Sequence, residues 1–138
     1  MKHTMRHLLT DITLVFVACV ILLAGAVILS AQQPPQPAAI ALLADGAPLG
    51  PTVTPPSSGL VTFTARITAG SALLRRASLS VNTSGAATFF SPTPGPVSLS
   101  VYWGTAHQPN GAQAVLNASA TDTAGNTTTK AAVVTLVK

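Results

Sequence analysis

The chain has 138 residues, of which only 7% are charged, and its formal net charge is +4. Nucleic-acid-binding proteins gather their basic residues into a patch or stripe, whereas the Lys and Arg residues here are scattered along the chain, which argues against nucleic-acid binding. The single cysteine, Cys19, excludes an intrachain disulfide and a cysteine-based zinc site.

A short basic stretch followed by a long apolar run begins the chain. Residues 1–11 hold Lys2 and Arg6, and residues 12–31 are almost entirely apolar. As a helix this run would reach about 30 Å, the thickness of a bilayer's hydrocarbon core. A cleaved signal peptide has a shorter apolar core of roughly 7–15 residues and a small-x-small cleavage site, where this run offers Leu29-Ser30-Ala31. We therefore predict a transmembrane signal anchor over residues 12–31, with a cleaved signal as the alternative.

The orientation of this anchor follows from the charges on either side. No Lys or Arg occurs between the run and Arg66, so the positive-inside rule predicts a cytoplasmic segment 1–11 and an extracytoplasmic remainder. Val17-Ala18-Cys19 resembles a lipobox only loosely, because apolar residues continue well beyond the cysteine. A membrane-embedded thiol is the simpler interpretation of Cys19.

Residues 32–37 have the composition of a linker. The sequence Gln-Gln-Pro-Pro-Gln-Pro blocks helix and central strand alike and favours an extended, polyproline-like spacer. It separates the predicted anchor from a domain over residues 38–138.

From residue 38 onwards, apolar and polar residues alternate in short runs, as in strands with one buried face. The first run, with Ile40 and Leu42, stops at the turn pair Asp45-Gly46, and prolines make residues 48–56 irregular or at most an edge strand. Further strands are expected over residues 61–68, 76–81, 88–91, 97–103, 114–121 and 132–136, with a turn over 82–85. About seven short strands over about 100 residues predict an all-β, immunoglobulin-like β-sandwich.

The stretch 113–137 gives the clearest prediction, a β-hairpin that closes the domain. Two alternating runs flank the turn cluster Asp122-Thr-Ala-Gly125-Asn126. Asp caps a turn through its own side chain, and Gly or Asn can take positive φ.

Several motifs then occur in a recognisable order. They are Asp45-Gly46, Gly59-x-Val61-x-Phe63-x-Ala65, Trp103-x-Thr105, Asn110-Gly111 and the run Leu-Asn-Ala-Ser-Ala-Thr-Asp-Thr-Ala-Gly-Asn-Thr over 116–127. With them, residues 38–138 resemble the bacterial immunoglobulin-like domain family of surface and secreted proteins. The resemblance is strongest over 103–137. It weakens over 68–96, where Thr-Ala-Gly-Ser at 68–71 replaces an Asp-rich loop that could have held calcium. It implies a spacer, adhesion or partner-binding module.

The predicted domain offers few groups for catalysis. Asp45 and Asp122 lie in turn contexts, where capping of the backbone is the ordinary role of Asp, and His107 lies in a connection beside Pro109. Two distant carboxylates do not supply the six to eight oxygens that calcium requires. We therefore expect no enzyme, no cofactor, no metal and no small-molecule substrate.

Five residues are candidates for contact with another protein. Arg75 and Arg76 suit an acidic partner or lipid headgroups, although a solvated strand end is the plainer interpretation. Phe89, Phe90 and Tyr102 could form an exposed aromatic patch, because alternation must leave Phe90 or its neighbour facing outward.

Two functions remain open. The first is an accessory or scaffolding subunit of a bacterial membrane-protein complex, and the alternative is a cell-surface or secreted adhesion or structural protein.

Overall fold

The structure is a computed structural model that describes residues 34–82 and 84–138. In these residues it contains nine strands in two sheets and no helix, which confirms the predicted all-β class. Residues 35–138 form one compact unit. The predicted anchor over residues 12–31 lies outside the described residues, and within them no helix is long and apolar enough to cross a bilayer.

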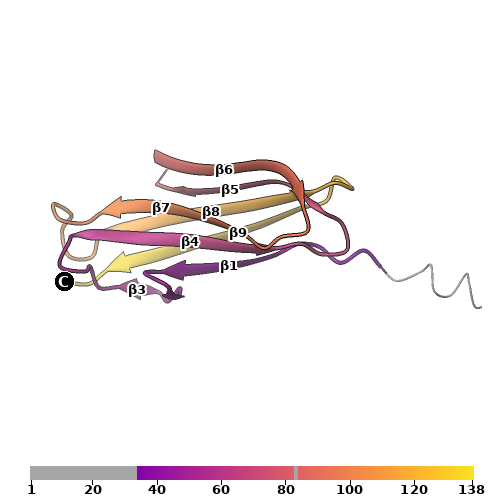
Figure 1. Ribbon diagram of the computed structural model, residues 1–138. Helices are drawn as coiled ribbons and strands as arrows, with labels where there is room; N and C mark the ends of the chain where they lie inside the picture. Colours follow the sequence, from indigo (N-terminus) through magenta and orange to yellow (C-terminus); the bar gives the residue numbers. More distant parts are fainter. Residues whose placement is uncertain (1–33, 83) are drawn as a thin grey trace, which may run out of the picture. The chain divides into compact units, whose positions relative to one another are not determined.

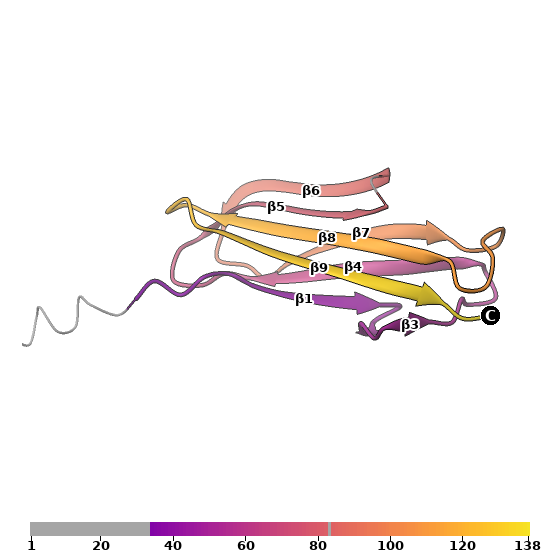
Figure 2. The same ribbon diagram turned by 180° about the vertical axis from the view of Figure 1, so that it is seen from behind.

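The strands form a four-stranded and a five-stranded sheet (Figures 1 and 2). The first sheet has the order β2-β1-β4-β7 and contains β1 (Ala39–Ala44), β2 (Ala47–Pro48), β4 (Leu60–Thr68) and β7 (Val97–Gly104). The second has the order β3-β9-β8-β5-β6 and contains β3 (Thr52–Val53), β5 (Leu74–Val81), β6 (Ser84–Thr93), β8 (Gln113–Asp122) and β9 (Thr127–Leu136). Neighbouring strands are antiparallel except for the parallel pair β3–β9.

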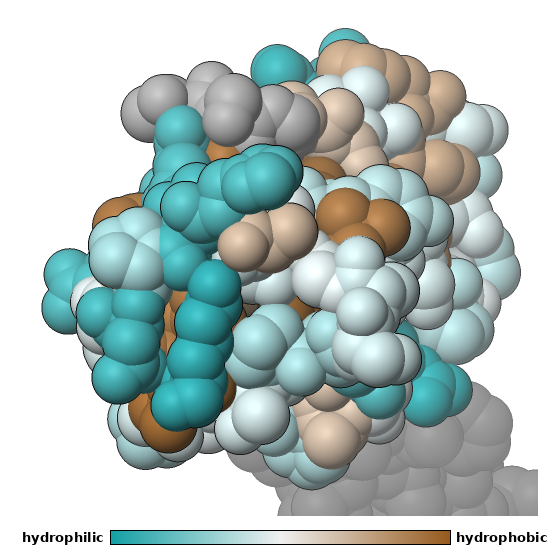
Figure 3. All heavy atoms as spheres, turned by 90° about the vertical axis from the view of Figure 1, so that its left-hand side faces the viewer, coloured by the Kyte–Doolittle hydropathy of each residue, from teal (hydrophilic) through white to brown (hydrophobic). Residues whose placement is uncertain are grey.

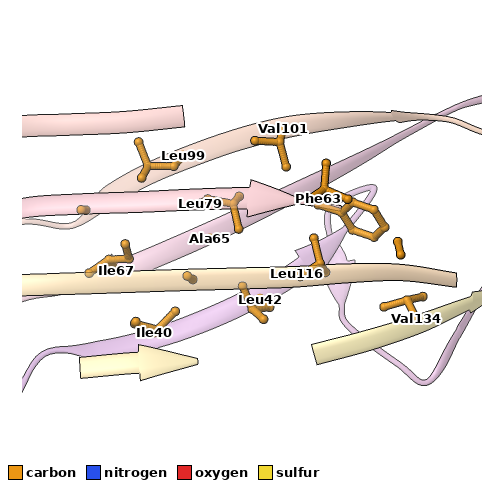
Figure 4. Packing of buried hydrophobic residues seen from close by; sticks show 14 of the residues in the cluster. Ile40, Leu42, Phe63, Ala65, Ile67, Leu79, Leu99, Val101, Leu116 and Val134 are labelled. Atoms are coloured by element: carbon orange, nitrogen blue, oxygen red, sulfur yellow. The ribbon is translucent and has the colours of Figure 1, made fainter. Parts of the chain in front are cut away.

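Alternation along each long strand builds the core between the two sheets. Along β7, for example, Val97, Leu99, Val101 and Trp103 are buried while the residues between them are exposed. Figure 4 shows side chains from both sheets meeting in this core. The ring of Trp103 stacks on Phe63 of the neighbouring strand β4, with centroids 6.1 Å apart and planes 25° apart. Trp103 is thus a core residue.

The segment expected to be irregular or at most an edge strand contributes only the two-residue strands β2 and β3, each at an edge of its sheet, in line with that expectation. Three strands begin more than one residue earlier than expected. Strand β5 begins at Leu74 instead of residue 76, and β9 begins at Thr127 instead of residue 132. Strand β6 begins at Ser84, earlier than the expected residue 88. Asn82 takes the left-handed conformation with φ of 48°, and Val81 pairs directly with Ser84, so the chain reverses before Ser84.

The Asp45-Gly46 pair forms the predicted turn and joins β1 to β2. Both residues have positive φ, 47° and 83°, the requirement of a type I′ hairpin turn. The Asp45 carboxylate also accepts a hydrogen bond from the backbone amide of Thr62 at 2.9 Å, and the Asp45 amide donates to the Thr62 carbonyl at 2.8 Å. Asp45 therefore fixes this turn to strand β4.

The other predicted turn pair, Asn110-Gly111, ties the C-terminal strand to the preceding connection. The Asn110 side chain accepts a hydrogen bond from the amide of Lys138 at 2.9 Å. Gly111 has φ of 85°, and its amide donates to the carbonyl of Leu136 at 2.8 Å. The end of the domain that carries this connection presents hydrophilic surfaces beside smaller hydrophobic ones (Figure 3).

Candidate interaction surface

Three of the five candidate contact residues gather around one open depression on the second sheet. Arg75, Arg76 and Phe90 line it, together with Ser91, Pro92 and Thr121, and its volume is about 540 Å³. We call this site the arginine depression. Sequence reasoning found the two arginines and Phe90 but missed the three other residues that line the depression.

An irregularity in strand pairing explains the depression. Leu74 pairs with Asp122 and Arg76 with Thr121, so Arg75 is an extra residue relative to strand β8. A bulge of this kind re-aims a side chain. Leu74 and Ala77 are buried while Arg75 and Arg76 are both exposed, so two adjacent guanidinium groups share one face.

Strand β6 is irregular at the same place. Leu74 pairs with Thr93 and Arg76 with Phe90, which leaves Ser91 and Pro92 opposite the bulge. Pro92 has no amide proton to contribute to the ladder. The sheet therefore loosens between β5 and β6 where the depression lies.

The chemistry of the arginine depression is cationic and aromatic. The guanidinium carbon of Arg76 lies 5.1 Å from the centroid of the Phe90 ring, within cation–π distance. Phe90 is 65% exposed. The lining residues include no carboxylate. Such a site suits an anionic group attached to an apolar body, because Arg presents several donors that match carboxylate and phosphate oxygens.

The two remaining aromatic candidates lie elsewhere. Phe89 is half-buried and packs against the core, which leaves Phe90 as the outward residue of the pair. Tyr102 is 63% exposed and lies on β7, the edge strand of the first sheet. On the outer face of the same sheet, the hydroxyls of Thr64 on β4 and Ser100 on β7 share a hydrogen bond at 2.9 Å. The predicted aromatic patch is therefore divided between two sheets.

The turn at residues 122–126 borders the arginine depression and is held by its own side chains. The Asp122 carboxylate accepts hydrogen bonds from the backbone amide of Asn126 at 2.8 Å and from its side-chain amide at 2.9 Å. Gly125 has φ of 88°, as a positive-φ turn position requires. The hydrogen bond from the Asn126 side chain lowers the pKa of Asp122 and, with backbone hydrogen bonds, outweighs the opposing effect of burial. The three structural turn residues proposed from the sequence therefore act as one unit.

Near this turn, the start of the domain is tied to the loop that joins β4 of the first sheet to β5 of the second. The hydroxyl of Ser71 accepts a hydrogen bond from the amide of Gln36 at 3.0 Å, and the Ser71 amide donates to the Gln36 carbonyl at 3.0 Å. Gly70 makes room for this contact, because a Cβ there would overlap the Gln36 carbonyl. No local pattern predicts this tie, since residues 35 positions apart form it.

A second, smaller depression lies on the outer face of the second sheet. Its volume is about 240 Å³, and most of the residues that line it carry hydroxyl or amide side chains, among them Ser78, Asn117 and Thr129. Ser78 and Ser119 share a hydrogen bond at 2.8 Å. Lys130 also lines it, and its ammonium group donates to the Ile40 carbonyl at 3.2 Å, which links β9 to β1 of the other sheet.

The titratable residues considered for catalysis are dispersed. Asp45 is bound to Thr62 near the start of β4, whereas Asp122 pairs with Leu74, at the start of the strand that follows β4. His107 is exposed. Within residues 34–82 and 84–138, no group of three His, Cys, Asp or Glu side chains lies close enough to hold a metal ion.

Comparison with known proteins adds no relative. No protein-family model matches this chain, and no curated protein matches it significantly.

Proposed function

We propose that this protein is a non-catalytic, membrane-anchored immunoglobulin-like module that serves as an accessory or scaffolding subunit of a membrane-protein complex. Residues 12–31 are its transmembrane segment, and residues 38–138 are its extracytoplasmic domain. The strand order supports the immunoglobulin-like part of this proposal. Strands β1, β4 and β7 stand where A, B and E stand in such sandwiches, and β9, β8 and β5 stand where G, F and C stand.

The observation that carries the subunit role is the tie at Gln36. Its three hydrogen bonds with Ser71 fix the point where the chain enters the domain. Only residues 32–35 separate this point from the apolar run, and they span at most roughly 14 Å when fully extended. An adhesin must extend far from the membrane, whereas a subunit that covers a neighbouring membrane protein needs a short connection that leaves its domain at a fixed point.

The surface around Tyr102 is the proposed contact with a protein partner. This side chain is 63% exposed on an edge strand, and Tyr supplies a large contact area with a polar tip. Among the described residues, edge strand β7 pairs only with β4, and an edge strand of this kind can accept a partner along its other side.

The test is an intact-mass and co-purification experiment on the native protein, extracted from membranes in mild detergent. The proposal expects the full N-terminal segment in the measured mass and a defined membrane protein at fixed stoichiometry. Tyr102→Ala is expected to weaken that association, whereas Thr88→Ala, an exposed change on the other sheet, leaves it intact. A mass that begins near Gln32, with the protein free outside the cell, would replace the proposal with a secreted binding module.

A further inference from the structure

The arginine depression lies at the end of the domain where the N-terminal segment leaves it. Strand β5 begins at Leu74, three residues after Ser71, which holds Gln36. The amide of Thr123 donates to the Leu73 carbonyl at 2.8 Å and so joins the β8–β9 turn to the same end. Figures 1 and 2 show β6 and β8 ending on the side where the chain enters β1.

The charge at this end is positive. Arg75 and Arg76 are exposed, and the carboxylate of Asp122, which belongs to the neighbouring turn, is occupied by Asn126. The other carboxylate among the described residues, that of Asp45, is bound to Thr62 at the opposite end of β4. The guanidinium groups therefore face an approaching anion with no free carboxylate among the lining residues.

Exposed apolar side chains accompany the charge. Leu73 is 44% exposed, directly before the buried Leu74, and Phe90 is 65% exposed beside Arg76. Basic residues combined with exposed Leu and Phe are the composition of surfaces that lie in a membrane interface. The two arginines alone would suit an acidic protein equally well. The exposed apolar side chains beside them, and the short connection to an apolar run, favour lipid as the partner.

We propose that Arg75, Arg76, Leu73 and Phe90 form a membrane-facing surface that binds the headgroups of anionic phospholipids. This inference rests on the proposed anchoring of residues 12–31. The guanidinium groups bind the phosphate oxygens, and Leu73 and Phe90 rest at the level of the headgroups. The domain is then held against the bilayer.

The test uses the full chain in lipid nanodiscs, made either of phosphatidylcholine alone or of phosphatidylcholine with phosphatidylglycerol. With Cys19→Ser as background, Ala124→Cys puts a donor fluorophore on the turn next to the depression, and Ser58→Cys puts it on the loop before β4. Both positions are exposed. An acceptor on a small fraction of lipid headgroups reports by energy transfer how often each position approaches the bilayer.

We expect strong energy transfer from position 124 only in discs that contain phosphatidylglycerol, and little from position 58 in either kind. Arg75→Gln should reduce the contact equilibrium about fivefold, and the double change with Arg76→Gln about thirtyfold. About 1 M salt, where the Debye length is about 3 Å, should have a similar effect. The matched control, Lys138→Gln, removes one positive charge from the C-terminus and should leave the transfer unchanged.

The outcomes separate this inference from the proposed function. A chain that does not stay with the discs contradicts the anchor, and with it both proposals. A chain that stays, but whose transfer from position 124 is insensitive to phosphatidylglycerol and to both arginines, overturns the lipid surface alone. In that case the arginine depression would have to serve an acidic protein.

Discussion

At the scale of single residues, Trp103 and Tyr102 are neighbours with opposite roles. The Trp103 ring is 6% exposed and stacks on Phe63, whereas Tyr102 is 63% exposed. Trp103→Ala should therefore destabilise the domain by about 3–5 kcal/mol, because it removes a large buried side chain and leaves a cavity. Tyr102→Ala should change stability by no more than about 0.5 kcal/mol. Urea unfolding measures both, and equal effects would contradict the assigned orientations.

Asp122 leads to a prediction about acid stability. Its folded-state pKa lies below the unfolded value of 3.8, because Asn126 stabilises the charged carboxylate. Its contribution is therefore fully present above about pH 4 and is lost as the pH falls through the lower, folded-state pKa.

Asp122→Asn should consequently lower the urea midpoint at pH 7 and flatten the further loss of stability between about pH 4 and pH 2. Urea titrations of the two proteins at a series of pH values measure this difference. If the original protein and the Asp122→Asn variant lose stability in parallel over that range, the Asp122 carboxylate is not the cause of the acid sensitivity.

At the scale of elements, the contact between Gln36 and the loop at 70–71 depends on the absence of a side chain. Gly70→Ala would place a Cβ on the Gln36 carbonyl and should release this segment, at a cost of about 1–3 kcal/mol, the range for overpacking. Gly104→Ala is the matched control, since nothing lies within 4 Å of a Cβ there.

Hydrogen exchange at the Ser71 amide, which donates to the Gln36 carbonyl, reports this release directly. Faster exchange in Gly70→Ala but not in Gly104→Ala is the expected result. Unchanged protection in both variants would mean that the loop adjusts without loss of the tie.

At the scale of the whole molecule, residues 35–138 contain the entire described core and form one compact unit. A fragment with these residues should fold alone and unfold in one cooperative transition, because its core needs no partner chain. Circular dichroism should show β structure without appreciable helix. Substantial helix, or a broad transition without a baseline, would contradict the two-sheet fold.

Several residues of the candidate surface could be predicted from the sequence, but their proximity to one another could not. Arg75, Arg76 and Phe90 were identified as individual candidates. Their meeting depends on the pairing of β6 with β5 and on the bulge at Arg75. Strict alternation would have sent Arg75 and Arg76 to opposite faces. The choice between Phe89 and Phe90 as the outward ring likewise required the register of β6.

The sequence by itself determined the strands and their buried faces, because alternation and turn chemistry are local. Asp45-Gly46, for example, favours a tight turn between two strands through its own backbone preferences. The tertiary structure alone decided which strands are neighbours, where the ladder bulges and which distant groups bond. The Lys130 ammonium reaches the Ile40 carbonyl across 90 positions, and Ser71 reaches Gln36 across 35. Such contacts depend on how two sheets pack, and packing is a property of the whole core rather than of any one segment.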